Sequence, residues 1–130
     1  MSSNAPLAER AKETRTASRP GPPWLLCRLC SHRITEAVAA VSFDGAHRHA
    51  FSNPAGLTFT IGVFDHAPGC VHEGEATEYY SWFPGYAWRI ARCGGCRSHL
   101  GWCFECIGTP GPGEPPDFHA LILDRLRAGP

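Results

Sequence analysis

Residues 93–104 read Cys93-Gly-Gly-Cys96-Arg-Ser-His-Leu-Gly-Trp102-Cys-Phe104, and an earlier segment reads Cys27-Arg-Leu-Cys30. In each Cys-x-x-Cys pair both thiolates can face one ion while the backbone amides of the turn point at the sulfur atoms. Two such pairs supply the four ligands of a tetrahedral zinc site. Four thiolates leave no position for an activated water, so we expect one structural zinc ion bound by Cys27, Cys30, Cys93 and Cys96.

A third pair, Cys103 and Cys106, leaves a second arrangement open. Together with the pair at 93 and 96 it could form a compact site without the N-terminal pair. Against this, Leu100–Cys106 has the pattern of a strand, on which residues three apart point to opposite faces. Cys70, two residues before His72 in an expected polar loop, is a further candidate for an additional metal site.

Composition limits the class of protein. The chain of 130 residues has room for one domain, and its 12 basic and 12 acidic residues cancel. This balance predicts no binding to nucleic acid through phosphates, and no apolar run is long enough to cross a membrane. Seven cysteines without a secretory signal fit a reducing compartment, so we expect a cytoplasmic protein.

The domain boundary is expected near Trp24. Residues 1–23 are rich in Ala, Ser, Arg and Pro and predict a disordered tail, and residues 24–130 form the folded domain. Within the domain, short apolar runs alternate with Gly, Pro, Asn and Asp, which indicates a mostly β fold. The predicted strands are Ala37–Phe43, Arg48–Phe51, Leu57–Phe64, Ala87–Arg92, Leu100–Cys106 and Phe118–Leu123, with residues 117–127 open to a strand or a short helix.

The densest feature is aromatic: Tyr79-Tyr-Ser-Trp-Phe-Pro-Gly-Tyr-Ala-Trp88 precedes the second cysteine pair. The turn at residues 83–85 lets Trp82 and Trp88 converge, and Trp102 on a following strand can form a third wall, with Phe104 on the same side. Three Trp side chains can enclose a small apolar box. Such a box suits a methylated ammonium, through cation–π attraction, or a small amide or imide ring.

These segments together resemble the cereblon-type thalidomide-binding (CULT) domain family, in particular its single-domain bacterial members. The resemblance rests on the two Cys-x-x-Cys pairs, on Asn53-Pro-Ala-Gly56, on Ser81-Trp-Phe-Pro-Gly-Tyr-Ala-Trp88, and on Cys93–Phe104, and it covers residues 24–128. It implies a β-tent, two antiparallel β-sheets meeting at an angle and pinned by a four-cysteine zinc site.

The resemblance also implies a non-enzymatic binding module for cyclic imides, such as the glutarimide of thalidomide-type ligands or C-terminal cyclic imides of damaged proteins. The Tyr80 carbonyl would accept the imide N–H, and the Trp82 N–H would donate to an imide carbonyl. The expected ligand-binding residues are Asn53, Tyr80, Ser81, Trp82, Trp88, Trp102 and Phe104.

The chain departs from animal members of the family, which have His at the position of Tyr80 and after Pro54. The other cereblon segments find no counterpart, so no ubiquitin-ligase adaptor is expected as a partner. Two alternatives remain: an enzyme resembling the B-type methionine sulfoxide reductases that uses Cys103 and Cys106, and a reader of methylated ammonium groups.

Overall fold

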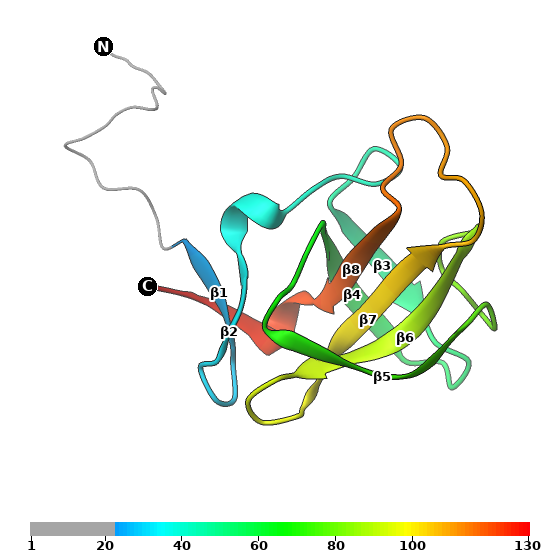
Figure 1. Ribbon diagram of the computed structural model, residues 1–130. Helices are drawn as coiled ribbons and strands as arrows, with labels where there is room; N and C mark the ends of the chain where they lie inside the picture. The colour runs from blue at the N-terminus through cyan, green and yellow to red at the C-terminus, as the bar shows by residue number, and fades with distance from the viewer. Residues whose placement is uncertain (1–22) are drawn as a thin grey trace, which may run out of the picture.

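The computed structural model describes residues 23–130, which fold into nine strands and two short 3₁₀ helices (Figure 1). The tail predicted for residues 1–23 therefore lies outside the described residues, apart from Pro23. No helix of residues 23–130 is long and apolar enough to cross a membrane. The elements are β1 (Trp24–Cys27), β2 (Arg33–Glu36), η1 (Ala37–Ala39), β3 (Arg48–Ser52), β4 (Thr58–Phe64), β5 (Cys70–Thr77), β6 (Tyr86–Cys93), β7 (His99–Cys106), β8 (Asp117–Ile122), η2 (Leu123–Arg125) and β9 (Leu126–Gly129).

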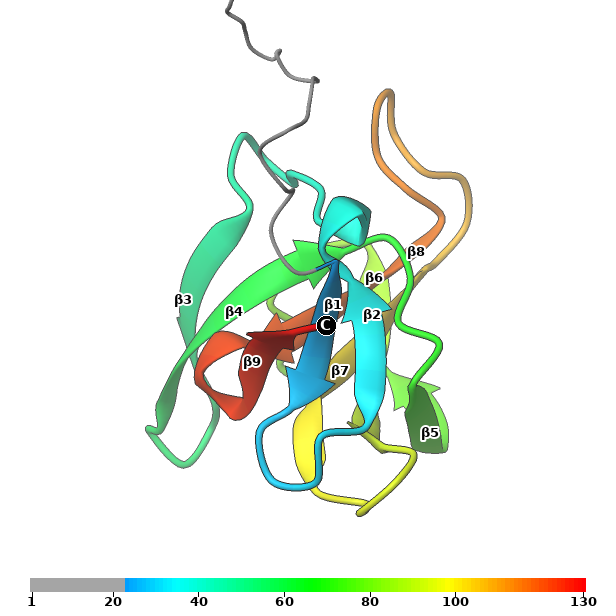
Figure 2. The same cartoon turned by 90° about the vertical axis from the view of Figure 1, so that its left-hand side faces the viewer.

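The strands form two sheets, in which every pair of neighbours is antiparallel. The small sheet has the order β2-β1-β9 and the large sheet the order β3-β4-β8-β7-β6-β5. Figure 2 shows the small sheet in front of the large one, with β9 following β8 through η2. The predicted mostly β fold of two antiparallel sheets is confirmed.

Two apolar clusters lie on opposite faces of the large sheet, because side chains alternate along each strand. The aromatic cluster contains Phe43, Phe83, Tyr86, Trp102, Phe104 and Phe118, with Ile61, Val63, Ala120 and Ile122. The second cluster fills the space between the sheets and contains Cys27, Ile34, Ala39, Phe64, Ala67, Cys93, Leu100, Leu121 and Leu126. On β7, the side chains of Trp102 and Phe104 thus point to the aromatic cluster, and the side chain of Cys103 points to the opposite face of the sheet.

Two predictions about secondary structure are wrong. Ala37–Phe43 is not a strand: η1 occupies its first part, and Ala40 makes only an isolated bridge with Phe64. Ala39 and Phe43 are buried in the two apolar clusters, but Val38 is 85% exposed, and the segment packs on the large sheet without pairing continuously with one of its strands. The expected polar loop around Cys70 and His72 is instead the strand β5. This strand lies at the edge of the large sheet and pairs only with β6, so its polar side chains can stay exposed.

The segment 117–127, for which a strand and a short helix were both open, contains both. It forms β8, then the single turn η2, then β9 in the other sheet. Because β9 pairs with β1 through Cys27↔Leu126, this change of sheet brings the end of the chain beside the first cysteine pair.

Candidate metal centre and ligand-binding cavity

The two Cys-x-x-Cys loops have the same backbone structure, although their other residues differ. In the first, the N–H of Cys27 donates to the His32 carbonyl at 2.8 Å, and in the second the N–H of Cys93 donates to the Ser98 carbonyl at 2.8 Å. The residues after each pair, Ser31 and Arg97, both have a φ of 68°. Each loop is therefore a tight turn that brings its two thiols to one side.

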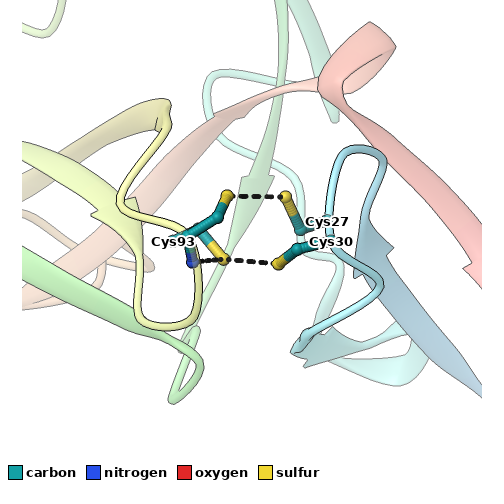
Figure 3. Close-up of side chains that lie close together, drawn as sticks. Cys27, Cys30 and Cys93 are labelled. Atoms are coloured by element: carbon teal, nitrogen blue, oxygen red, sulfur yellow. Dashed lines mark hydrogen bonds between the residues drawn. The ribbon is translucent and has the colours of Figure 1, made fainter.

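The four sulfur atoms lie within 4.8 Å of one another, between the β1–β2 loop and the β6–β7 loop (Figure 3). The Sγ atoms of Cys27 and Cys96 are 3.7 Å apart, and those of Cys30 and Cys93 are 3.5 Å apart. Ligands about 2.3 Å from a tetrahedral zinc ion lie about 3.8 Å apart, so these separations fit zinc. The predicted cluster of Cys27, Cys30, Cys93 and Cys96 is present, in an arrangement that fits one structural zinc ion.

Hydrogen bonds surround the second cysteine pair, and at Cys96 they favour the thiolate. The N–H groups of Gly95 and Cys96 donate to Cys93 Sγ at 3.3 and 3.5 Å, and the Ser98 hydroxyl oxygen lies 3.2 Å from Cys96 Sγ. Hydrogen bonding with Ser98 lowers the pKa of Cys96 to about 6. The thiolate is the form that binds a metal, so the loop prepares this ligand at neutral pH.

The alternative site built on Cys103 and Cys106 is not formed. These two residues project to opposite faces of β7, as the strand pattern predicts: Cys106 packs against the aromatic cluster, and Cys103 lies near His119 on the other face. Cys103 is 5% exposed, and burial raises the pKa of its thiol to about 11. A buried neutral thiol is a poor nucleophile, so the geometry gives no support to a reductase.

A cavity of about 390 Å³ opens on the aromatic face of the large sheet. Six of the seven residues predicted to bind a ligand line it, and the seventh, Ser81, does not: its hydroxyl donates to the Phe83 carbonyl at 3.1 Å within the turn. The lining residues are Asn53, Pro54, Leu57, Phe59, Tyr80, Trp82, Trp88, Ile90, His99, Trp102, Phe104 and Arg125.

The tryptophan side chains of the cavity are held in place by hydrogen bonds and aromatic contacts. Trp82 Nε1 donates to the Ser52 carbonyl at 2.9 Å, and Trp88 Nε1 donates to the Tyr79 carbonyl at 2.7 Å. The rings of Trp82 and Trp102 meet edge to face, with centroids 4.6 Å apart and planes at 72°. Because both indole N–H groups are paired with backbone carbonyls, Trp82 and Trp88 offer the cavity their apolar ring surfaces.

The loop before β6 contributes Tyr80 and Trp82 to the cavity, and each has a backbone group without a hydrogen-bond partner in the described part of the chain. Tyr80 has a φ of 56°, which is rare for a residue with a side chain and turns the chain sharply before Trp82. Within residues 23–130, no hydrogen bond uses the Tyr80 carbonyl oxygen or the Trp82 N–H. One acceptor and one donor of the backbone are thus free in residues that line the cavity.

The lining residues that the sequence interpretation missed include His99 and Arg125, and Arg125 places a positive charge at the rim. Nη1 of Arg125 donates to the His99 carbonyl at 2.8 Å, and the guanidinium lies 5.7 Å from the Phe59 ring centroid. Burial first, and then the Arg125 charge, lower the pKa of His99, so its ring is neutral at physiological pH. His99 could have been predicted as a site residue, because it lies in the sequence between Cys96 and Trp102. No motif near Arg125 indicated that this residue lines the cavity.

The Asn53 side chain stabilises the loop that forms one side of the cavity. The side-chain Oδ1 accepts from the Leu57 N–H at 2.9 Å, and the backbone N–H of Asn53 donates to the Leu57 carbonyl at 2.9 Å. These bonds close the turn between β3 and β4 and place Pro54 and Leu57 against the cavity.

No family model matches the chain. Protein cereblon of Drosophila persimilis is 36% identical over 109 residues, which are 79% of this chain and 17% of that protein. Protein cereblon of Danio rerio is 40% identical over 77 residues, which are 59% of this chain and 17% of that protein. For Protein cereblon of Drosophila melanogaster the values are 36% over 87 residues, 62% and 14%. The aligned region of this chain thus corresponds to 14–17% of the length of these relatives.

Proposed function

The chain carries a cereblon-type (CULT) domain, and we propose that this domain is a zinc-stabilised, non-enzymatic module that binds small cyclic imides in its aromatic cavity. The observation that carries the proposal is the combination of apolar walls with two free backbone groups. An imide ring needs flat apolar surfaces for its ring atoms, an acceptor for its N–H and a donor for its carbonyl oxygens. In this proposal the Trp rings supply the apolar surfaces, the Tyr80 carbonyl is the acceptor and the Trp82 N–H is the donor, since all these residues line the cavity.

The two backbone groups supply the selectivity in this proposal. A hydrocarbon ring of the same size would leave the Tyr80 carbonyl and the Trp82 N–H buried without partners, at a cost of about 1–3 kcal/mol for each group. An imide pairs with both groups at once. Asn53, Trp88, Trp102 and Phe104 act in this proposal through shape, because they define the walls and one side of the cavity.

The rim favours an uncharged ligand over a methylated ammonium. Cation–π attraction to the Trp rings would favour an ammonium group. However, the Arg125 guanidinium also lines the cavity, and its charge repels a second cation in a partly desolvated site. A neutral imide does not meet this repulsion, and its carbonyl oxygens carry partial negative charge. A C-terminal cyclic imide on a damaged protein is one natural source of this chemistry.

A ligand titration tests the proposal. Zinc-loaded protein is titrated with glutarimide and with succinimide, following the intrinsic Trp fluorescence and the heat of binding. We expect saturable binding with one site per chain, and weaker binding of N-methylglutarimide, which has the same ring but no N–H donor. Tetramethylammonium serves as the competing ligand class. Equal affinity for glutarimide and its N-methyl form would contradict the assigned role of the Tyr80 carbonyl.

A further inference from the structure

On the face of the large sheet opposite the tryptophan cavity, three side chains from three strands meet. They are His72 on β5, Cys103 on β7 and His119 on β8, and one ligand atom from each lies within 4.8 Å of the others. Nε2 of His72 and Nε2 of His119 are 2.8 Å apart. None of the three residues belongs to the four-cysteine centre or lines the aromatic cavity.

The sheet register explains how His72 on the edge strand reaches this cluster. His72 pairs with Ala91 across β5 and β6, and Ala91 pairs with Gly101 across β6 and β7. Paired residues project to the same face of the sheet. Only the methyl group of Ala91 and the backbone of Gly101 therefore lie between His72 and β8 in this row. Cys103 and His119 are themselves a register pair, which places the thiol beside the imidazole.

The hydrogen bonding of His119 is incomplete. The residue is only 9% exposed, and its Nδ1 is buried without a hydrogen-bond partner. Burial and the neighbouring His72 lower the pKa of His119 to about 4, so the ring is neutral and carries one proton. With that proton on the unpartnered Nδ1, the lone pair is on Nε2, the nitrogen that faces His72. Burial also lowers the pKa of His72, which therefore offers a neutral ring too. A neutral imidazole is the form that binds a metal ion.

We propose that His72, Cys103 and His119 form a second metal site, which takes a zinc-like divalent transition-metal ion. Two imidazole nitrogens and one thiolate are a borderline-soft ligand set that suits zinc. Three protein ligands leave a fourth position for water, and the exposed His72 leaves that position open to solvent. Binding converts the Cys103 thiol to a thiolate and releases one proton to the solvent.

The surroundings of the site are compatible with a cation. Arg89, which pairs with Cys103 across β6 and β7, makes an ion pair with Glu105, so its charge is compensated. The Nε2 atoms of the two histidines must separate by about half an ångström, because ligands of a tetrahedral zinc ion lie about 3.3 Å or more apart. His72 can supply this movement because it is exposed and lies on the edge strand.

Cobalt tests the site after the four-cysteine centre has been filled with zinc. Cobalt(II) does not displace zinc from thiolates readily, because zinc binds more tightly in the order of divalent metals. The reduced, zinc-loaded protein is titrated with Co²⁺, and the near-ultraviolet absorption from thiolate to cobalt charge transfer is recorded. We expect one further Co²⁺ per chain, with this charge-transfer absorption.

Three variants decide whether the proposed ligands hold the cobalt. His72→Ala alters an exposed side chain and should weaken cobalt binding by more than about tenfold while leaving the melting temperature unchanged. Cys103→Ser should abolish the charge-transfer absorption, and Cys106→Ser, a matched thiol on the same strand, should keep it. The proposal is wrong if zinc-loaded protein takes up no further cobalt, or if His72→Ala binds cobalt with the affinity of the wild type. If Cys103→Ser does not fold, the His72→Ala result decides.

Discussion

The four-cysteine centre and the aromatic cavity both use the hairpin of β6 and β7, but they are built in different ways. The centre takes all its ligands from two short loops with the same turn, so most of its geometry is local. The cavity collects side chains that lie between residues 53 and 125, from two loops, the three strands β4, β6 and β7, and η2. We therefore expect that the loss of one ligand abolishes metal binding at the centre. The loss of one lining residue should weaken ligand binding in the cavity only by the contacts that this residue makes. The variants below test this difference.

The largest effect is expected from the centre itself. Cys27→Ser removes a fully buried ligand and leaves three thiols, so we expect the loss of zinc and a decrease of more than about 3 kcal/mol in the free energy of unfolding. Zinc content and a thermal melt followed by circular dichroism measure this. Cys106→Ser is the control, because Cys106 is outside the centre and should keep one zinc per chain. An unchanged melt for Cys27→Ser would mean that the centre does not stabilise the fold.

The next effect should appear in binding with the centre intact. Trp82→Ala removes one wall of the cavity and the edge-to-face contact with Trp102, so we expect imide affinity to decrease by about 2–4 kcal/mol. Zinc content should not change. Trp24→Ala is the matched control, because Trp24 lies on β1 with Arg33 over its ring at 4.5 Å and does not line the cavity. Calorimetric titration with glutarimide compares them, and retained affinity in Trp82→Ala would contradict the cavity assignment.

A smaller effect, on the free energy of unfolding, is expected from Tyr86, which follows the loop that carries Trp82. Tyr86 is 1% exposed and its hydroxyl donates to the Pro115 carbonyl at 2.6 Å. Tyr86→Phe should lower the free energy of unfolding by about 1 kcal/mol and leave zinc content unchanged. Tyr79→Phe, at a 68% exposed position, should have no effect. Denaturant unfolding of both variants measures the difference.

The difference in stability between the wild type and Tyr86→Phe depends on pH, and the pKa of Tyr86 gives the direction of this dependence. Burial raises the pKa of Tyr86 from 10.0 to about 12, so the unfolded chain loses this proton at a lower pH than the folded chain. The contribution of Tyr86 is present below pH 10 and is lost as the pH rises to about 12. The stability difference between the wild type and Tyr86→Phe should therefore shrink over this range. A difference that stays constant would mean that the hydroxyl is not buried in the folded state.

The smallest effect concerns ligand charge. Arg125→Met keeps an alkyl chain near Phe59 but removes the positive charge from the rim, so tetramethylammonium should bind more tightly by about 1 kcal/mol or less. Glutarimide affinity should change by less than about threefold. Arg127→Met, at an exposed position outside the cavity, should change neither affinity. Tighter binding of tetramethylammonium than of glutarimide by the wild type would contradict the preference for a neutral ligand.

The strands that sequence patterns located best are those with one apolar face. Leu57–Phe64 and Leu100–Cys106 correspond closely to β4 and β7, because both alternate and both pack on the aromatic cluster. The strand β5 was missed because it lies at the edge of the sheet, where its mostly exposed polar side chains give no apolar period. The short strands β1, β2 and β9 were missed because their sheet depends on pairing between the two ends of the domain.

The sequence by itself identified Cys-x-x-Cys pairs as the metal ligands, and Trp82, Trp88, Trp102 and Phe104 as the residues of an aromatic box. Cysteine spacing fixes which ligands a tight turn can present, and an aromatic residue carries its large apolar surface wherever it is placed. Only the tertiary structure decided which cysteine pairs meet, that Arg125 reaches the cavity, and that His72, Cys103 and His119 share one face. These groupings depend on strand order and register, which are set by contacts between residues far apart in the chain.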